Sequence, residues 1–503
     1  IAATNPAAQR KAAVDSTETL INSHKQWAQA RGASNKAAAL ENLIAKAETR
    51  REILAQLIKT NPAEALQIAI PNEKQAGMPE QVLDLLEQRM ELEGELEVVI
   101  EDYDDGSNRL RHILKTPFGD RFELHLSAKG KVLQSGTRVN VYGLLLEDDS
   151  IDTSTDGDMA ISENPDDLLT LAADGGSTGG SNGGTATLPN TMGEQKVLVM
   201  LVNFQDDTSQ PWSKATIQNR METVDQFMRE NSYQQTWLNT DVSNWMTLPI
   251  SASATCNYDH IGAEGDNAAR NAGINVDAYD RLVYIFPRNS CPYLGLGTVG
   301  GSPSRAYIRG TDNWETIAHE LGHNLGLSHS HDYKCNGSTL GSNCSSVEYG
   351  DYADIMGAWV PGHFNAYQKD RLGWFGNNIQ TITSSGTYQL SPQEFEGNYP
   401  LALKVFRGVD PVTGLNWWYY LEQRKAVGFD SVLPTMSNNF ENGITVHMGD
   451  PDYGNSSFLL DMQPETANHI DAALEPGRSF ADSDAGVTIT TEAVNSNDSL
   501  VTV

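Results

Sequence analysis

Apolar residues recur at helical spacing through residues 1–91. The stretch NKAAALENLIAKAETRREILAQLIK combines this spacing with strong helix formers. Gly32 and Pro62 interrupt the pattern, which therefore predicts two long antiparallel helices followed by shorter ones near 63–70 and 79–91. No cluster of His, Cys and Asp occurs in this region. The sequence of 1–91 thus favours a helical packing module.

From residue 92 the period of the apolar pattern changes to two. ELEVVIEDYDDGSNRLRHILKT, DRFELHLSA and TRVNVYGLLLED alternate apolar and polar residues and are separated by Gly, Asp and Asn. About five strands in so short an interval predict a small β-barrel of the OB type over 92–149. Within it, DYDDGSN (102–108) faintly resembles a calcium loop. Gly106 stands where an oxygen ligand is expected, so a hairpin turn is predicted there.

Residues 150–193 have the composition of a linker. The acidic run DTSTDGDMAISENPDD is followed by DGGSTGGSNGGTATLPN. Such a segment predicts an exposed, cleavable tether between the N-terminal modules and the rest of the chain.

Beyond the tether, strand and helix patterns alternate. KVLVMLVNF (196–204) and RLVYIFP (281–287) are typical of buried strands, and TIQNRMETVDQFMRENSYQQ (216–235) is typical of a helix. This alternation predicts an α/β domain over 194–375. The stretches after it, from GTYQLS to GVTITTEAV, are all strand-like and predict a β-sandwich over 376–503. We therefore expect a multidomain α+β protein.

The net charge of the chain excludes two classes of binding partner. It has 66 acidic and 35 basic side chains, a formal net charge of −31. Such a polyanion is repelled by nucleic acid and by anionic membranes. No apolar run approaches the ~20 residues that span a bilayer. We expect neither nucleic acid nor a membrane as a partner, and a monomer is the favoured oligomeric state.

The cysteines predict the compartment. Cys256, Cys291, Cys335 and Cys344 are an even number, which suggests two disulfides and a secreted, extracellular protein. Four cysteines allow three pairings. Cys256–Cys291 and Cys335–Cys344 are favoured because each closes a modest local loop. Four unpaired buried thiols are the alternative until the compartment is known.

Four of the eleven histidines fall within TIAHELGHNLGLSHSHDY (316–333). Asp312 followed by Glu315 has the spacing of a capping box and predicts a helix that begins near Asn313. Apolar residues recur every four positions in this helix, which therefore has a buried face.

Two of these histidines share one face of the predicted helix. His319 and His323 are four residues apart, so a single Zn²⁺ can bind both imidazoles. Glu320 is offset on the helix and can hold a metal-bound water without being a ligand itself. An exposed helix with incidental histidines is the alternative, but it conflicts with the buried apolar face.

The residues after His323 extend the pattern. Gly326 can adopt φ > 0 and end the helix, which lets the chain turn back so that His329 reaches the same metal. With this chain's composition, such a motif arises by chance in roughly 3 of 100,000 chains. His331 lies outside the pattern and is interpreted as a histidine behind the ligands or at the surface, since catalytic zinc keeps its fourth position for water.

The pattern H-E-x-x-H-x-x-G-x-x-H from His319 to His329 resembles the signature of the metzincin zinc endopeptidases. That group also has a methionine in a tight turn beneath the zinc, a role that Met356 in YADIMGAW matches. Ordinary core packing would explain Met356 if it stood alone.

Within the metzincins, the chain is most similar to the gametolysin family, over about 194–480. The similar stretches are HELGHNLGLSHS, DIMG, HFNAYQKDRLGW and, more loosely, YYLEQRKAVGFDS. Some gametolysin relatives have Gln as the first ligand, whereas His319 favours ordinary zinc binding here.

One family feature is missing from this chain. Astacins and serralysins have a Tyr two residues after the turn methionine that can bind zinc or the transition state. This chain has Ala358 there, so that role is vacant or filled by another residue. Tyr349 and Tyr352 are the nearby candidates for that role, although buried packing is the favoured interpretation of each.

The resemblance implies a secreted, zinc-dependent endopeptidase that acts on proteins or peptides. Zn²⁺ on His319, His323 and His329 would lower the pKa of its bound water and polarise the scissile carbonyl. Glu320 would accept the proton of that water and return it to the leaving amine.

The modules ahead of the protease domain are expected to form a propeptide, which makes the protein a zymogen. Matrixin proenzymes hold their zinc with a cysteine, a residue that 1–255 lacks. Astacin proenzymes use an Asp in a Phe/Gly/Asp motif. Phe118, Gly119 and Asp120 match this motif faintly, and a plain turn is the favoured interpretation. Another acidic residue or a steric plug is equally open.

Two other functions remain open from the sequence. A non-enzymatic extracellular adhesion or binding protein could carry a structural zinc, but such a site would not require Glu320 and is usually closed by a fourth Cys or His. An exopeptidase would share the chemistry of an endopeptidase and differ in the shape of its cleft.

Overall fold

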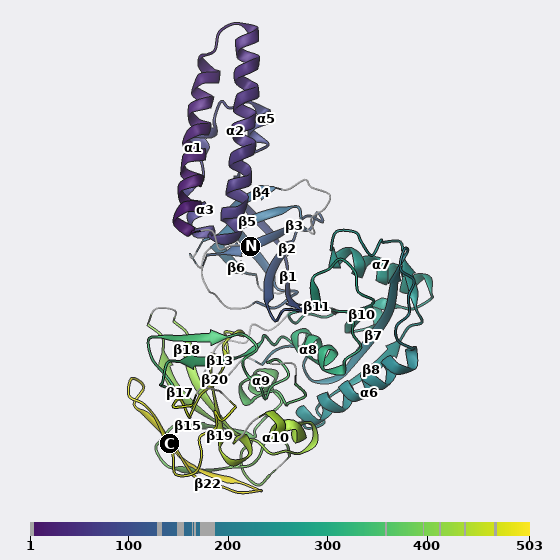
Figure 1. Ribbon diagram of the computed structural model, residues 1–503, viewed down its shortest axis with the longest axis vertical. Helices are drawn as coiled ribbons and strands as arrows, with labels where there is room; N and C mark the ends of the chain where they lie inside the picture. Colours follow the sequence, from purple (N-terminus) through teal and green to yellow (C-terminus); the bar gives the residue numbers. More distant parts are fainter. Residues whose placement is uncertain are drawn as a thin grey trace. The chain divides into compact units, whose positions relative to one another are not determined.

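The chain divides into two units, neither of which is continuous in sequence (Figure 1). In this computed structural model, unit 1 comprises Ile1–Val98 and Arg111–Thr178, and unit 2 comprises Val99–Leu110 and Gly179–Val503. The residues that the structure describes are 5–127, 133–147, 155–162, 164, 167–171, 187–357, 360–395, 397–411, 414–436, 439–466 and 470–503.

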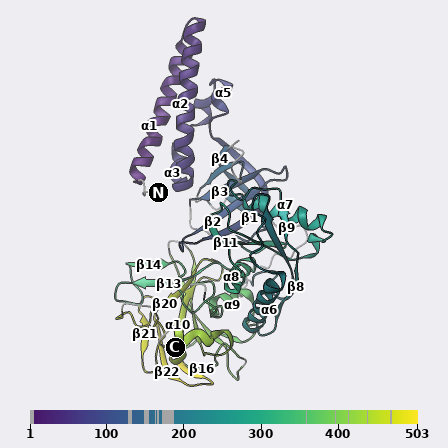
Figure 2. The same ribbon diagram turned by 45° about the vertical axis from the view of Figure 1, so that its right-hand side comes forward.

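Unit 1 begins with the two long helices that the sequence predicts, α1 (Pro6–Gln29) and α2 (Ala33–Thr60), which lie side by side in both views (Figures 1 and 2). Asn5 caps α1 by accepting a hydrogen bond from the Ala7 N–H. Gly32, with φ of 81°, provides the turn between the helices. The helices that follow are α3 (Pro62–Ile68), α4 (Asn72–Gln75) and α5 (Glu80–Leu83).

The last predicted helix, 79–91, is wrong in its second half. Helix α5 ends at Leu83, and strand β1 (Gln88–Tyr103) begins five residues later. Residues 89–96 alternate in burial with period two, and this sheet pattern outweighs the helix-forming composition of the segment.

The strands after β1 are β2 (Asn108–Lys115), β3 (Arg121–Leu126), β4 (Arg138–Glu147), β5 (Gly157–Ile161) and β6 (Leu168–Thr170). They pair in the order β6-β4-β5-β3-β2-β1, and β4 also pairs with β1. The order of pairing therefore returns to β1, as in the small barrel expected here, which stays a prediction.

The acidic half of the predicted linker contains structure. Strand β5 pairs with both β3 and β4, and β6 pairs with β4. Met159, Ala160 and Ile161 are buried, so these apolar residues complete the sheet of unit 1. The Gly-rich run at 174–184 lies outside the described residues.

Unit 2 contains an α/β sheet of the kind that the sequence predicts for 194–375. Its strands are β7 (Gly193–Phe204), β8 (Thr236–Val242), β9 (Met246–Leu248), β10 (Arg281–Phe286), β11 (Tyr293–Thr298) and β12 (Ser304–Arg309). The strands run in the order β11-β12-β10-β7-β8, with β9 beside β7. All of these pairs are parallel except β11 with β12, which is antiparallel.

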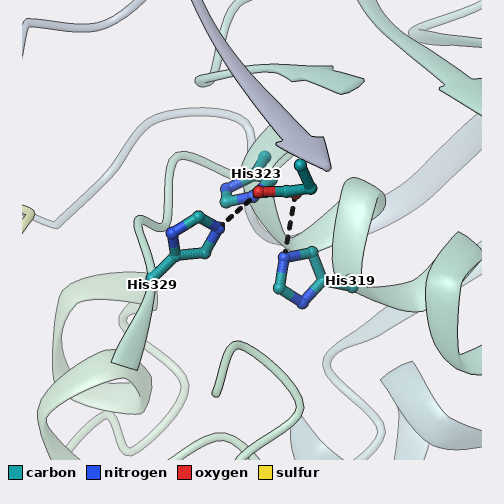
Figure 3. A group of neighbouring side chains, drawn as sticks. His319, His323 and His329 are labelled. Atoms are coloured by element: carbon teal, nitrogen blue, oxygen red, sulfur yellow. Dashed lines mark ion pairs between the residues drawn. The ribbon is translucent and has the colours of Figure 1, made fainter. Parts of the chain in front are cut away.

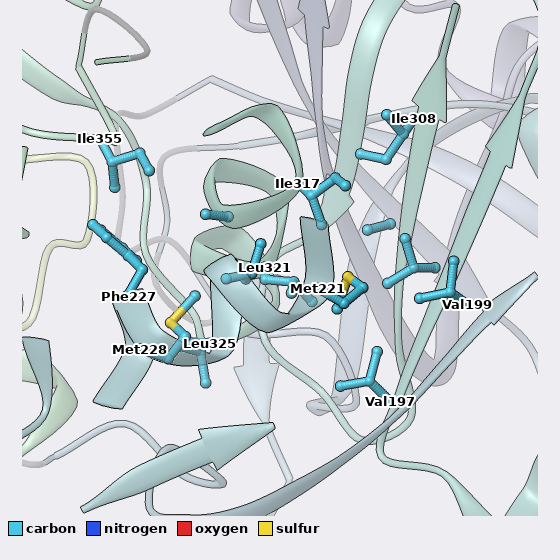
Figure 4. Close-up of a cluster of buried hydrophobic side chains, with 14 of the residues drawn as sticks. Val197, Val199, Met221, Phe227, Met228, Ile308, Ile317, Leu321, Leu325 and Ile355 are labelled. Atoms are coloured by element: carbon cyan, nitrogen blue, oxygen red, sulfur yellow. The ribbon is translucent and has the colours of Figure 1, made fainter. Parts of the chain in front are cut away.

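Helices cover both faces of this sheet. Val283, Ile285 and Ile308 share one core with helices α6 (Lys214–Asn231) and α8 (Trp314–Asn324) (Figure 4). The alternate residues Tyr284 and Tyr307 face the other way, against α7 (Tyr258–Asn271), where Gly265 and Gly262 let the tyrosines approach. The α/β sheet thus fixes α8, which carries two histidines.

The rest of unit 2 forms a seven-stranded and a four-stranded sheet. The first has the order β14 (Cys344–Val347), β13 (Ser330–Cys335), β20 (Ser457–Leu460), β19 (Ile444–Gly449), β18 (Asn416–Gln423), β17 (Ala402–Val409) and β15 (Ile379–Ile382). The second has the order β16 (Thr387–Leu390), β23 (Ser499–Thr502), β22 (Val487–Val494) and β21 (Ser479–Asp482). The helical segments here and after α7 are η2 (Val276–Ala278), α9 (Ala366–Leu372), η3 (Gly428–Val432), α10 (Leu433–Met436) and η4 (Phe440–Asn442).

Both sheets contribute side chains to one hydrophobic core. Strands β13 and β14 precede residue 376, yet they pair with strands that follow it. The sheet with the returning strand after His329 is therefore continuous with the C-terminal strands. The predicted multidomain α+β class is confirmed in this mixture of helices and sheets, while the β-sandwich and the five domain boundaries stay predictions.

The disulfides are the two that the loop lengths favour, Cys256–Cys291 and Cys335–Cys344. Among the described residues, no helix is both long and apolar enough to cross a membrane.

The core beneath α8 gives a first test. Ile308 is fully buried, so Ile308→Ala should lower the free energy of unfolding of unit 2 by about 2–5 kcal/mol through lost burial and a residual cavity. Val409→Ala, at a side chain that is 57% exposed, should change it by less than ~0.5 kcal/mol. Urea denaturation followed by tryptophan fluorescence measures both. Equal midpoints for the two variants would contradict the assigned core.

Candidate metal centre

Helix α8 begins at Trp314, as expected, but without the predicted capping box. Asn313 is the N-cap residue and makes no side-chain capping hydrogen bond. Asp312 instead accepts a hydrogen bond from Arg220 Nε at 3.1 Å, which ties α8 to α6. An ion pair between two helices has replaced the local cap, an outcome that spacing along the chain does not reveal.

The helix ends as Gly326 requires. Its φ is 98°, and its N–H donates to the carbonyl oxygen of His323 at 2.8 Å. The next N–H, from Leu327, donates to Gly322 O at 3.1 Å. The chain then turns back, and His329 lies immediately before β13. Pairing of β13 with β20 fixes the direction of this returning segment.

The rings of His319, His323 and His329 point toward one another (Figure 3). Their centroids are separated by 4.8 Å, 4.9 Å and 5.3 Å, and all three side chains are buried. The structure therefore brings together the three predicted ligands, two from α8 and one from beyond its C-terminus.

Each ring is oriented through its Nδ1 atom. Carbonyl oxygens lie next to two of these atoms: Ile355 O is 2.7 Å from His319 Nδ1, and Leu327 O is 2.8 Å from His323 Nδ1. A carbonyl oxygen can only accept, so both Nδ1 atoms carry the proton. In the neutral ring this leaves the Nε2 lone pair pointing into the site, as a metal ligand requires.

A fourth residue, Asp102 of β1, enters the same site. Its Oδ2 lies 3.3 Å from His319 Nε2 and 3.4 Å from His323 Nε2, and its Oδ1 lies 3.0 Å from His329 Nε2. The Asp102 side chain is fully buried. Burial would raise the pKa of this carboxyl, but the histidines, above all His329, outweigh it and hold the pKa well below its usual range.

Asp102 reaches the site because β1 lies along the edge of the α/β sheet. Residues 99–103 of β1 pair antiparallel with β11, with Asp102 opposite Gly295. Beyond it, Asp104 Oδ2 lies 3.1 Å from Arg288 Nη1 and 3.4 Å from Arg309 Nη1. Both the backbone pairing and these ion pairs belong to unit 2.

These four side chains fit a zinc ion. Without a metal, the lone pairs of neutral imidazoles and of a carboxylate would face one another at close range. Only a cation or added protons between them make such a buried contact favourable. Three nitrogens and one oxygen are a ligand set that Zn²⁺ prefers. The residues that could hold it are His319, His323 and His329, with Asp102 beside them.

Glu320 is placed next to this group without joining the histidines. It is fully buried, and burial together with the Asp102 carboxylate raises its pKa well above the usual range. Strand β11 crosses directly over it: a Cβ on Gly295 would lie 1.8 Å from Glu320 Oε1, and one on Gly297 would lie 2.9 Å from Oε2. The two glycines thus leave the space that Glu320 occupies.

Glu348, a residue that the sequence did not single out, organises the third histidine. Glu348 Oε1 accepts from His329 Nδ1 at 2.6 Å, and its Oε2 accepts from His331 Nε2 at 3.1 Å. His331 is buried, and its Nδ1 lies 3.2 Å from Ser457 O. His331 therefore stands behind His329 and shares its carboxylate partner, in agreement with its exclusion from the ligands.

Met356 lies in a tight turn below α8. It is fully buried, and a Cβ on Gly322 of the helix would lie 2.4 Å from its Sδ. The turn also supplies Ile355 O to His319 and Met356 O to the Ser330 N–H. The predicted methionine turn thus contacts both ligand-bearing segments, while Ala358 lies outside the described residues.

The two tyrosine candidates differ. Tyr349 is half-buried, and its hydroxyl donates to Asp102 Oδ1. Tyr352 is 39% exposed. The two tyrosines lie in the same loop and differ only in their contacts in the folded protein. The sequence alone could therefore not show which of them reaches the site.

The carboxylate that faces the three histidines belongs to Asp102 and not to Asp120 of the Phe/Gly/Asp stretch. Phe118 is 93% exposed, and Asp120 accepts from Thr116 Oγ1 in a turn of unit 1. Asp102 belongs instead to DYDDGSN, where the predicted hairpin turn is confirmed between β1 and β2. The signal that could have identified it is a buried-strand pattern that ends in an acidic residue.

Comparison with known proteins agrees with this geometry. Residues 213–407 match the model of the gametolysin peptidase M11 family, which confirms the resemblance of this part of the chain to that family. No curated protein matches the chain. Among solved structures, metalloproteinase-II from Bacteroides fragilis matches with 14% identity and a TM-score of 0.24, over 55% of this chain and 80% of that chain. At this TM-score we draw nothing from the structural likeness.

The contact between Glu348 and His329 predicts an effect on metal binding. Glu348→Gln removes the carboxylate that orients His329 and should weaken zinc binding by about 10- to 100-fold. Glu222→Gln, at an exposed carboxylate on α6, should leave it unchanged. Competition with a chromophoric chelator measures both dissociation constants. Equal zinc affinity in the two variants would show that Glu348 does not support the site.

Proposed function

We propose that this protein is a secreted zinc endopeptidase of the metzincin type, made as a zymogen. The observation that carries the proposal is the convergence of three Nε2 atoms, from His319, His323 and His329, on one buried point beside Glu320. The match to a metallopeptidase family supports hydrolysis of peptide bonds as the reaction.

His319, His323 and His329 would hold a zinc ion, which would supply Lewis acidity to the scissile carbonyl and to the attacking water. Glu320 then accepts the proton of the attacking water and delivers it to the leaving amine. Its buried position favours this task, because burial raises the pKa of this carboxyl and so strengthens it as a proton acceptor.

The edge of the α/β sheet supports cleavage within a chain rather than at its end. Among the described residues, strand β11 pairs with β12 on one side and with the β1 segment 99–103 on the other. Without that segment, β11 offers an open strand edge to an extended peptide. A peptide added there would run past Glu320 in both directions, since β11 crosses directly over this residue.

The zymogen part of the proposal rests on Asp102. This residue places a carboxylate against all three histidines, and its own strand occupies the edge of β11. Asp102 precedes the tether in the sequence, so a cut in the Gly-rich run 174–184 would separate it from the histidines covalently. Departure of the N-terminal part would then expose the metal and the strand edge together.

An adhesion protein with a structural zinc is the less favoured alternative. A structural site is usually closed by ligands of the folded core itself. Here the group opposite the histidines belongs to a segment ahead of a cleavable tether, and Glu320 lies buried beside it. The two disulfides support an extracellular protein, and proteins or peptides would be its substrates.

The mechanism predicts separate roles for metal and base. After cleavage of the tether, Glu320→Gln should retain zinc but lower kcat on peptides by a factor on the order of 10²–10⁴. Glu315→Gln, on the first turn of the same helix, should behave as wild type. Metal analysis and fluorogenic peptide hydrolysis measure the two properties. Wild-type turnover by the Glu320 variant would rule out its role as the base.

Latency predicts the behaviour of the uncut chain. Asp102→Ala should let the full-length protein hydrolyse a short peptide at least about tenfold faster than uncut wild type. The variant loses the contact between the Asp102 carboxylate and the histidines, and a loss of ~1.4 kcal/mol in inhibitory binding free energy corresponds to a tenfold change. Asp105→Ala, in the same hairpin but exposed, should stay latent. Full activity of uncut wild type, or equal latency of both variants, would contradict the role of Asp102.

A further inference from the structure

The side chain of Tyr349 touches the one group that stands where a reacting peptide would sit. Its hydroxyl donates a hydrogen bond to Asp102 Oδ1, the same oxygen that lies 3.0 Å from His329 Nε2. A carboxylate has two oxygens on one carbon, as does the tetrahedral intermediate of peptide hydrolysis. Asp102 therefore stands in for the reacting carbon and its two oxygens.

The protease part of unit 2 holds Tyr349 in place without help from Asp102. Its ring lies 4.2 Å from the His329 ring, centroid to centroid. The preceding residue, Glu348, is fixed by His329 and His331. On the other side, a Cβ on Gly350 would lie 2.8 Å from Asp332, so the backbone there is closely packed. These contacts of the Tyr349 ring and backbone come from residues after the tether and do not involve β1.

The backbone of Tyr349 is unusual in a way that serves this placement. Its φ is 55°, in the left-handed region that a bulky residue adopts at a cost of about 1–3 kcal/mol. This conformation allows two consecutive side chains, Glu348 and Tyr349, to face the metal centre from one loop.

We infer that Tyr349 is a catalytic residue, which donates its phenolic hydrogen bond to the oxygen that becomes negatively charged when water adds to the scissile carbonyl. The phenol keeps its proton throughout, and no bond to Tyr349 forms or breaks. The inference rests on the proposed peptidase function. It adds the transition-state partner that the zinc ligands and Glu320 do not provide.

The test compares Tyr349→Phe with Tyr352→Phe in the zinc-loaded chain after cleavage of its tether. Tyr352 is the matched control because it is a tyrosine of the same loop with an exposed side chain. Tyr349→Phe should lower kcat by a factor on the order of 10², with KM within about twofold and zinc content unchanged, because a donor used only in the transition state is lost. Tyr352→Phe should match wild type.

Inhibitor binding distinguishes a hydrogen bond from a structural effect. A phosphinic peptide presents a tetrahedral centre with two oxygens, and Tyr349→Phe should weaken its binding by about tenfold or more. A thiol peptide binds zinc through sulfur and offers no such oxygen, so its affinity should be unchanged. Loss of zinc, equal weakening of both inhibitors, or a kcat equal to wild type would each overturn the inference. Cleaved wild type could instead prove inactive on peptides while still binding the phosphinic peptide more tightly than Tyr349→Phe does. That result would count against the proposed peptidase function but not against the hydrogen bond of Tyr349.

Discussion

Three buried imidazoles that face a single point impose the constraint on which this structure depends. Each ring is fixed through its Nδ1 atom, so the three Nε2 atoms have no freedom to turn away from one another. Such a group is stable in a buried site only when a cation or added protons lie between the facing lone pairs. The surrounding sheets and loops hold three segments in this geometry: helix α8, the segment after Gly326 and the methionine turn.

The same constraint links the metal centre to the rest of unit 2. Helix α8 is fixed by the apolar core of the α/β sheet, and the segment after His329 is fixed by strand pairing with β20 near the C-terminus. Strand β11 lies close above Glu320 because it has glycine at 295 and 297. A chemical site of a few residues thus requires long-range contacts from most of unit 2, and the position of Asp102 shows that residues ahead of the tether can reach it as well.

The sequence predicted the features that depend on local spacing. The positions of His319 and His323 on a helix, the left-handed Gly326 and the return of His329 all follow from residues within a single segment. Asp102 and Glu348 were not found in this way, and Tyr349 could not be told apart from Tyr352. These residues reach the site through strand pairing and loop packing across many residues. The buried-strand pattern before Asp102 marks its segment, but no local signature shows that its carboxylate faces the histidines. The same reason explains the error in 79–91 and the presence of β5 and β6 in the acidic half of the predicted tether, where sheet pairing outweighed composition.

The central claim is that three histidines bind zinc and that Asp102 occupies the remaining position in the uncut chain. The most direct test is a crystal structure of the zinc-loaded full-length protein with anomalous diffraction at the zinc edge. We expect one peak about 2.0–2.1 Å from Nε2 of His319, His323 and His329, with an Asp102 oxygen at a similar distance. An anomalous peak elsewhere, or a zinc ion on the three histidines that Asp102 does not touch, would contradict the account.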